Sequence, residues 1–348
     1  MRSASRNAGG RGAGWNAARL AALLLAVLCI ARGPAAHASE GEQNLPPDRE
    51  PVDMLDRGRG LIGDRLIDLI DGIDRFFGDD NYTGTTNESF LRISPGLRLR
   101  DRGSVAALKL RVRANLQLPR TEHRLALVLS GRTSPDDPQD DTLSEEEGID
   151  AALRAVLFDD LKNKIRLSTG ARFLPRPDPF VRLRLQRREP LGRLAIVPSL
   201  TGFWELEDGF GVRPRLDFNY GVGPRALVRL RGEGKYGEST AGVEFGTSLS
   251  YIFSFRPGSA WVLRAGMSGE TRPDTGIVQV RAIARYRWSM LYPWLFFELE
   301  PGLRFNRSAE FDPSFEGWAR VEVVFGYLGR FGRFGSAWPP APPTETPD

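Results

Sequence analysis

The sequence predicts an all-β protein: a transmembrane, antiparallel, up-and-down β-barrel that is preceded by a short amphipathic helix. The predicted number of strands is about 14, in the range of about 12–16. Three observations carry this prediction. Hydrophobicity alternates with a period of two from residue 88 onwards, the first 38 residues are typical of an export signal, and no cysteine follows them.

Residues 1–38 are predicted to be a secretory signal peptide. Five arginines and no acidic residue accompany the apolar run Leu20–Ala31, and the small residues Ala36 and Ala38 mark a cleavage site. The single cysteine, Cys29, lies within that run, so the exported chain is expected to form no disulfide. Of the 48 basic residues, 48 − 5 = 43 remain without these five arginines, against 44 acidic residues. The nearly neutral balance removes the charge argument for nucleic-acid binding.

Two segments are predicted between the signal and the barrel. Residues 39–53 are polar and proline-rich and indicate a linker, and residues 54–80 are expected to hold a helix. Seven apolar residues recur there at helical spacing: Ile62, Leu66, Leu69, Ile70, Ile73, Phe76 and Phe77. Four aspartates occupy the opposite side: Asp64, Asp68, Asp71 and Asp74. We hypothesise that residues 61–77 pack at the periplasmic mouth of the barrel or plug its lumen, with docking to a periplasmic partner as the alternative.

The period of two predicts strands throughout residues 88–327. The expected strands are 89–100, 104–118, 123–131, 151–159, 165–174, 180–188, 193–206, 210–220, 225–236, 241–255, 260–270, 276–289, 294–307 and 315–327. The long connection Arg132–Asp150 follows the third strand, and the connections after even-numbered strands are short. Because outer-membrane barrels have short periplasmic turns and longer external loops, this connection is expected outside the cell. Residues 328–348 indicate a proline-rich tail.

The alternation gives each strand one polar face and one apolar face. Lys109, Arg111 and Arg113 alternate with Leu108, Leu110 and Val112, for example. We predict that the leucines face lipid and that the cations line the lumen. The pore-lining candidates are Arg98, Arg100, Lys109, Arg111, Arg113, Arg166, Arg172, Arg182, Arg184, Arg213, Arg215, Arg229, Arg231, Arg264, Arg281, Arg285 and Arg304. Cations exceed acids on the first six strands, which predicts a basic wall there.

The alternating strands and the aromatic residues near their ends resemble bacterial outer-membrane β-barrel proteins over residues 88–327. The resemblance is architectural and names no functional family. Such proteins often end in a strand with a glycine and two alternating aromatics; here Phe325 and Tyr327 match, whereas Glu322 occupies the glycine position. The resemblance implies outer-membrane location and contact with lipid, lipopolysaccharide and the barrel assembly machinery.

The sequence offers little support for catalysis or metal binding. After the signal, His123 is the remaining histidine, it lies in an expected turn, and no serine adjoins it. Without a cysteine or a histidine pair a zinc site is not expected. The acidic residues of the long connection lack the glycine-containing spacing of a Ca²⁺ loop, which favours a solvated loop. These residues are Asp136, Asp137, Asp140, Asp141, Glu145, Glu146, Glu147 and Asp150.

Three functions agree with these patterns. The leading one is a porin-like channel that passes small anionic solutes, since rings of arginine or lysine select anions. The alternative is a closed-lumen barrel with a structural or assembly-partner role, and an enzyme without a recognisable triad is third. We expect no cofactor and no nucleic-acid partner.

Overall fold

The computed structural model describes residues 65–74, 76–77, 89–101, 106–118, 125–132, 148–160, 162–173, 177–256, 258–289, 292 and 294–326. The predicted signal peptide, linker and C-terminal tail lie outside these residues, as do His123, Tyr327 and most of the long connection. Among the described residues, no helix combines the length and apolar character needed to cross a bilayer.

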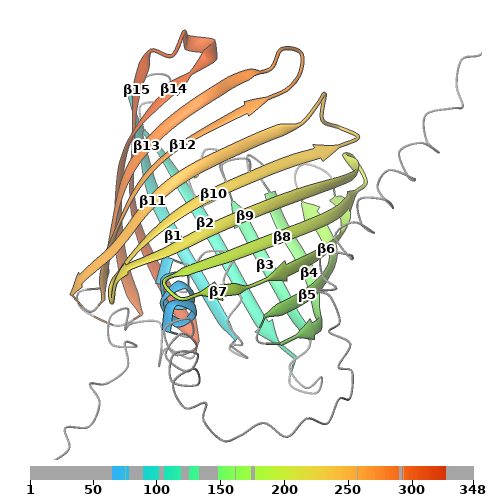
Figure 1. Cartoon of the computed structure of the whole chain (residues 1–348), viewed down its shortest axis with the longest axis horizontal. Coiled ribbons are helices and arrows are strands. Elements are labelled where there is room, and N and C mark those ends of the chain that lie inside the picture. Colours follow the sequence, from blue (N-terminus) through green and yellow to red (C-terminus); the bar gives the residue numbers. More distant parts are fainter. Residues whose placement is uncertain are drawn as a thin grey trace, which may run out of the picture. The chain divides into compact units, whose positions relative to one another are not determined.

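The chain forms a closed antiparallel barrel, so the predicted fold class is confirmed (Figure 1). Its strands are β1 Phe90–Arg100, β2 Ala106–Gln117, β3 Leu125–Arg132, β4 Gly148–Asp159, β5 Asn163–Phe173, β6 Pro177–Arg187, β7 Glu189–Leu191, β8 Leu194–Glu205, β9 Gly209–Gly223, β10 Ala226–Gly237, β11 Glu244–Arg256, β12 Ser259–Glu270, β13 Gly276–Ser289, β14 Leu295–Asn306 and β15 Pro313–Gly326. A short 3-10 turn, Arg307–Ala309, follows β14. Each expected strand matches an observed one, with ends that differ by a few residues.

Two pairings complete the ring of strands, and we call them the first and the second seam. The first strand pairs with the last, with Phe90 opposite Gly326, and β6 pairs directly with β8, with Phe180 opposite Glu205. The short β7 pairs with β8 only as a three-residue hairpin arm, so 14 strands make up the wall. Gly192 begins the turn of that hairpin at φ 66°, in the left-handed region that glycine adopts without steric cost.

The wall has an apolar outside and a polar inside, as predicted from the alternation. Leu108 is 80% exposed, whereas Arg111 on the same strand is 8% exposed. The same contrast holds on β11, where Leu249 is exposed between the buried Ser248 and Ser250. The exposed leucines form an apolar outer surface, the arrangement typical of membrane barrels, in which lipid-facing and lumen-facing residues alternate along each strand.

Aromatic residues gather on the outside of β11–β14. The ring of Tyr286 stacks between those of Trp261 and Trp288, at centroid distances of 4.7 and 4.8 Å, and Trp288 stacks on Phe297 at 5.7 Å. All four lie toward the end of the barrel where β1 starts and β15 finishes. This is the expected position for an interfacial aromatic girdle, since chain ends of such barrels are periplasmic.

The turn between β4 and β5 is fixed by one carboxylate. Oδ1 of Asp160 accepts hydrogen bonds from the backbone N–H groups of Lys162, at 2.7 Å, and Asn163, at 2.5 Å. These bonds stabilise the charged form and hold the pKa of Asp160 below its ordinary value. The turn therefore keeps its cap at neutral pH.

A charged residue on the outside of the wall is expected to destabilise the barrel. Leu249→Arg places a guanidinium near the middle of the lipid-facing surface and should lower the free energy of unfolding by about 2–4 kcal/mol. Urea unfolding of the barrel refolded in lipid vesicles measures this. The control is Ser239→Arg in the exposed loop before β11, which should change the value by less than about 0.5 kcal/mol. Equal effects of the two substitutions would contradict the assignment of the outer face.

Candidate functional site

The predicted pore-lining residues all lie on the inner face of the wall. Buried are Arg98, Arg111, Arg166, Arg215, Arg229, Arg231 and Arg285. Half-buried are Arg100, Lys109, Arg113, Arg172, Arg182, Arg184, Arg213, Arg264, Arg281 and Arg304. Further arginines outside the predicted set share this face, among them Arg92 and Arg154, and both continue the period of two through Ser94 and Ala152.

One half of the lumen is built from matched ion pairs between neighbouring strands. On β9 and β10, Arg215 bonds Glu233 at 2.9 Å and Arg231 bonds Asp217 at 2.7 Å. These pairs lie directly opposite each other in the ladder, where opposite charges stabilise a sheet. They hold the wall together and leave little net charge toward the lumen.

A longer chain of ion pairs crosses β13, β14, β15 and β1. Arg285 bonds Glu300 at 2.5 Å, and Arg320 bonds Glu298 at 2.5 Å. Glu322 then joins Arg287 to Arg92, the latter at 3.4 Å, and so spans the seam between the first and last strands. All of these groups are buried, where an uncompensated charge would be costly, and each arginine has a carboxylate close by.

The second seam carries a ring of four charged groups. Arg172 and Arg182 each bond both Asp150 and Glu205, at distances from 2.8 to 3.4 Å. The guanidinium of Arg182 also lies over the ring of Phe180, 4.0 Å from its centroid. Two residues of the predicted basic wall therefore belong to a neutral ring that links β4, β5, β6 and β8.

A group of three arginines converges on a single carboxylate at the end of the lumen away from the chain ends. Glu316 on β15 accepts bonds from Arg100 of β1 at 3.0 Å, Arg304 of β14 at 2.6 Å and Arg281 of β13 at 3.4 Å. We call these four residues the Glu316 cluster. Sequence alone could not identify it, because it brings together residues more than 200 positions apart.

The middle of β2–β6 is basic in sequence and in space. Lys109, Arg111 and Arg113 of β2, Arg154 of β4, Arg166 of β5 and Arg184 of β6 lie on the inner face there. Arg166 is directly opposite Arg184 in the ladder, and the acids of these strands, Asp150, Asp159 and Asp178, lie at strand ends. We call the six cations the basic face.

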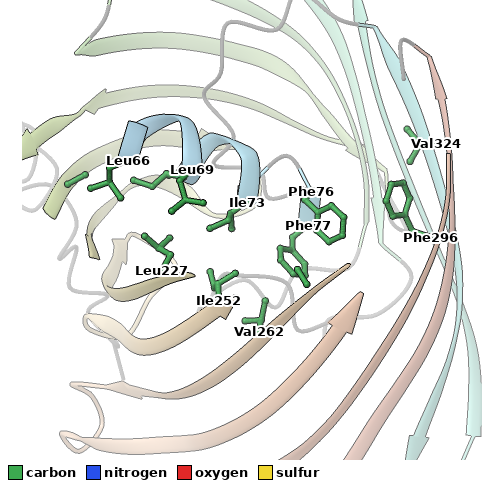
Figure 2. Packing of buried hydrophobic residues seen from close by; sticks show 13 residues of the cluster. Leu66, Leu69, Ile73, Phe76, Phe77, Leu227, Ile252, Val262, Phe296 and Val324 are labelled. Atoms are coloured by element: carbon green, nitrogen blue, oxygen red, sulfur yellow. The ribbon is translucent and has the colours of Figure 1, made fainter. Parts of the chain in front are cut away.

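An apolar patch interrupts the polar lumen near the chain ends, and the N-terminal helix covers it (Figure 2). The helix comprises residues 65–74, with Phe76 and Phe77 also helical. Six of its side chains are buried there: Leu66, Leu69, Ile70, Ile73, Phe76 and Phe77. The patch is formed by Ala195, Leu227, Ile252, Ala260, Val262, Phe296 and Val324, from β8, β10, β11, β12, β14 and β15.

Aromatic and charged contacts fix the C-terminal half of this helix. Phe76 packs edge-on against Phe296, with centroids 5.7 Å apart, and the Arg287 guanidinium lies over both rings. Asp71 accepts bonds from Arg188 at 2.9 Å, and Asp74 accepts one from Arg229 at 2.8 Å. Arg229 in turn donates to Asn219 at 2.7 Å, so its guanidinium is held by two partners.

The helix meets the wall mainly through its apolar face, and Asp71 and Asp74 add ion pairs with Arg188 and Arg229. The missed signal is the apolar residue that lies near one end of several strands on the inner face, such as Leu227, Ile252 and Phe296. The helix-facing role of these residues breaks the rule that lumen positions are polar.

The structure offers no metal site within the residues it describes, where no three potential metal-binding side chains come together. Of the acidic residues in the long connection, Asp150 is described, and it belongs to the ring with Arg172 and Arg182. His123 and the remaining acidic residues lie outside the described part of the chain.

The apolar contact is expected to dominate the docking of the helix. Phe76→Ala should weaken docking by about 3–5 kcal/mol, since it removes a buried aromatic ring. Asp71→Asn should weaken it by about 1 kcal/mol or less, because its partly exposed ion pair is screened. Protease cleavage of the folded barrel near residues 65–77 reports release of the helix. A larger effect of Asp71→Asn than of Phe76→Ala would contradict this order.

Comparisons with known proteins found similarity to solved structures alone. No family model matches the chain, and no curated protein matches it. Similar solved structures include OmpT, an outer membrane protein of Vibrio cholerae, at 11% identity over 70% of this chain and 99% of that one, with a TM-score of 0.41. OccK2 (OpdF) of Pseudomonas aeruginosa matches at 11% identity over 70% and 98%, with a TM-score of 0.42. The outer membrane channel DcaP of Acinetobacter baumannii matches at 8% identity over 68% and 96%, also at 0.42. At these values the likeness carries no argument about function.

Proposed function

We propose that this protein is an outer-membrane channel that passes small anionic solutes. The observation that carries the proposal is the unequal distribution of charge in the lumen. Arg215, Arg231 and Arg285 each have a carboxylate on the adjacent strand, whereas β2, β3 and β5 contain no acidic residue. A one-sided basic lining raises the local concentration of anions and selects them.

The size of the barrel supports a passage. Eight strands enclose an interior that wall side chains just fill, and barrels of 16–18 strands enclose an aqueous channel. A wall of 14 strands lies nearer the second case. The chain inserts a helix at one end of the lumen, and a lumen already filled by side chains would leave no room for a helix.

The energetics of the helix favour a fixed constriction. Each of its six buried apolar side chains contributes about 1.5–3 kcal/mol on burial. The ion pairs add less, because desolvation of Asp74 and Arg229 offsets much of their attraction. A transient anion that competes for Arg229 would therefore not displace the helix.

The helix also favours a second candidate function, a closed-lumen barrel with a structural or assembly-partner role. A helix seated across the periplasmic end could complete the closure of the lumen. Its described apolar side chains are buried against the wall, so a periplasmic partner would bind its polar side, where Asp68 is exposed. Lipid, lipopolysaccharide and the barrel assembly machinery remain proposed partners, in keeping with the apolar exterior.

Neutralising the basic face should reduce anion selectivity. In planar bilayers under a KCl gradient, we expect the wild-type reversal potential to indicate preference for chloride. Arg111→Gln with Arg113→Gln should shift it toward zero, because two charges leave the lining. The matched control is Arg215→Gln with Glu233→Gln, which removes a pair at constant net charge and should leave the reversal potential in place. Cation preference in the wild type would overturn the anionic assignment.

Removing residues 54–80 separates the two candidate functions. In a channel narrowed by the helix, the single-channel conductance should rise, because the lumen widens at its periplasmic end. Heat-modifiable migration on a gel checks that the shortened chain still folds. Unchanged conductance would show that the helix does not obstruct the path. No conductance in the wild type together with conductance in the shortened chain would support the closed-lumen role.

A further inference from the structure

Three turns on the chain-end side of the wall, between β7 and β12, share one pattern of charge. The turns and the strand ends beside them are residues 190–200, 218–228 and 250–262, and each segment contains one arginine as its sole charged residue. All three arginines are exposed. We call them the rim arginines, and they are Arg193, Arg225 and Arg256.

The connections at the other end of the same strands have the opposite character. Those between β8 and β9, β10 and β11, and β12 and β13 contain one basic residue, Arg272. Their acidic residues are Glu207, Asp208, Glu238 and Asp274. Turn geometry itself favours Asp, Asn, Gly and Pro, so it does not account for an arginine without any acid at three successive turns.

The rim arginines follow one another on adjacent hairpins, because β8 to β12 lie side by side in the wall (Figure 1). The carbonyl oxygen of Arg193 accepts a hydrogen bond from the N–H of Gly221 at 2.9 Å. That of Arg225 accepts one from the N–H of Ser254 at 3.0 Å. These bonds join each turn to the next hairpin. Since neighbouring strands lie about 4.7–4.9 Å apart, successive turns are spaced by about 10 Å.

A β-bulge directs Arg256 away from the lumen. The register of β11 and β12 shifts between Phe253 and Arg256, because β11 holds one extra residue there. Ile252 and Ser254 occupy even positions before the shift and are buried, so unbroken alternation would turn Arg256 inward as well. The extra residue reverses the alternation, and Arg256 is exposed on the outer side.

The guanidinium of Arg256 lies among the aromatic side chains of the outer face. It is over the ring of Phe255, 5.7 Å from the centroid, and its Nη2 donates to the hydroxyl of Tyr286 at 3.2 Å. Arginine has five N–H donors, so it can bind an oxyanion while it keeps this bond. Aromatic side chains of membrane proteins gather at the headgroup level, where lipid phosphates lie.

We propose that the rim arginines bind the phosphate groups of anionic phospholipids in the leaflet beside the chain ends, which is the periplasmic leaflet in barrels of this type. Guanidiniums suit phosphate because they donate two parallel N–H bonds. The exposed Tyr220 and Tyr251 on the adjoining outer face provide contacts for acyl chains, which an acidic protein partner would not use. This inference goes beyond the proposed function, because it holds for an open or a closed lumen.

Native mass spectrometry of the folded barrel tests the site, with phosphatidylglycerol and phosphatidylcholine of identical acyl chains as probes. The choline ammonium offsets the phosphate charge in the second lipid, so the wild type should bind phosphatidylglycerol more tightly. Arg225→Gln with Arg256→Gln should weaken phosphatidylglycerol binding about fivefold for each arginine removed, the effect of one cation near anionic lipid. Binding of phosphatidylcholine should change little.

The matched control is Arg272→Gln with Arg307→Gln, which removes two exposed arginines from the opposite end and should leave the lipid preference unchanged. Heat-modifiable migration verifies folding, and Arg225→Gln alone decides the test if the double variant does not fold. Equal binding of the two lipids by the wild type, or equal losses in the rim and control variants, would overturn the site. Lipid preference in a barrel that does not conduct would overturn the channel and leave the site.

Discussion

Backbone hydrogen bonding in lipid is the constraint on which the rest of this structure depends. No water reaches the hydrocarbon region, so every N–H and C=O group of the wall must pair with a neighbouring strand. The chain meets this requirement by pairing β1 with β15 and β6 with β8, so that the ring of strands has no open edge. Closure in turn fixes which face of each strand is inside, and the alternation then delivers the arginines to the lumen.

Placing so many arginines inside a barrel requires compensation, and the acidic residues of the wall are unevenly distributed along the chain. Acids from β8 to β15 neutralise their own strands and extend across both seams, where Glu322 reaches Arg92 and Glu205 reaches Arg172 and Arg182. The charges at the seams therefore support closure as well as neutrality. The strands between the seams contain few acids, and the basic character of the lumen is concentrated there.

The helix shows how an apolar contact can be specific inside a polar lumen. Its buried face matches a patch contributed by the ends of six strands, and it covers Phe296 and Val324 beside the first seam (Figure 2). Exposed to water, that patch would be unfavourable, so helix and patch stabilise each other. The ion pairs of Asp71 and Asp74 contribute more to the orientation of the helix on this patch than to the free energy of its docking.

The sequence by itself determined the barrel, the approximate strand bounds and the face on which each arginine lies, because a period of two is a local property that needs no knowledge of distant residues. It also indicated the helix and its two faces. Tertiary structure alone decided which charges meet. Glu316 binds Arg100, Arg281 and Arg304, which lie on strands that only closure of the barrel brings together. Arg172 and Arg182, predicted as part of the basic wall, belong to a neutral ring instead. The orientation of the helix also depended on the folded barrel, since its apolar partner surface exists only when these six strands come together in the wall.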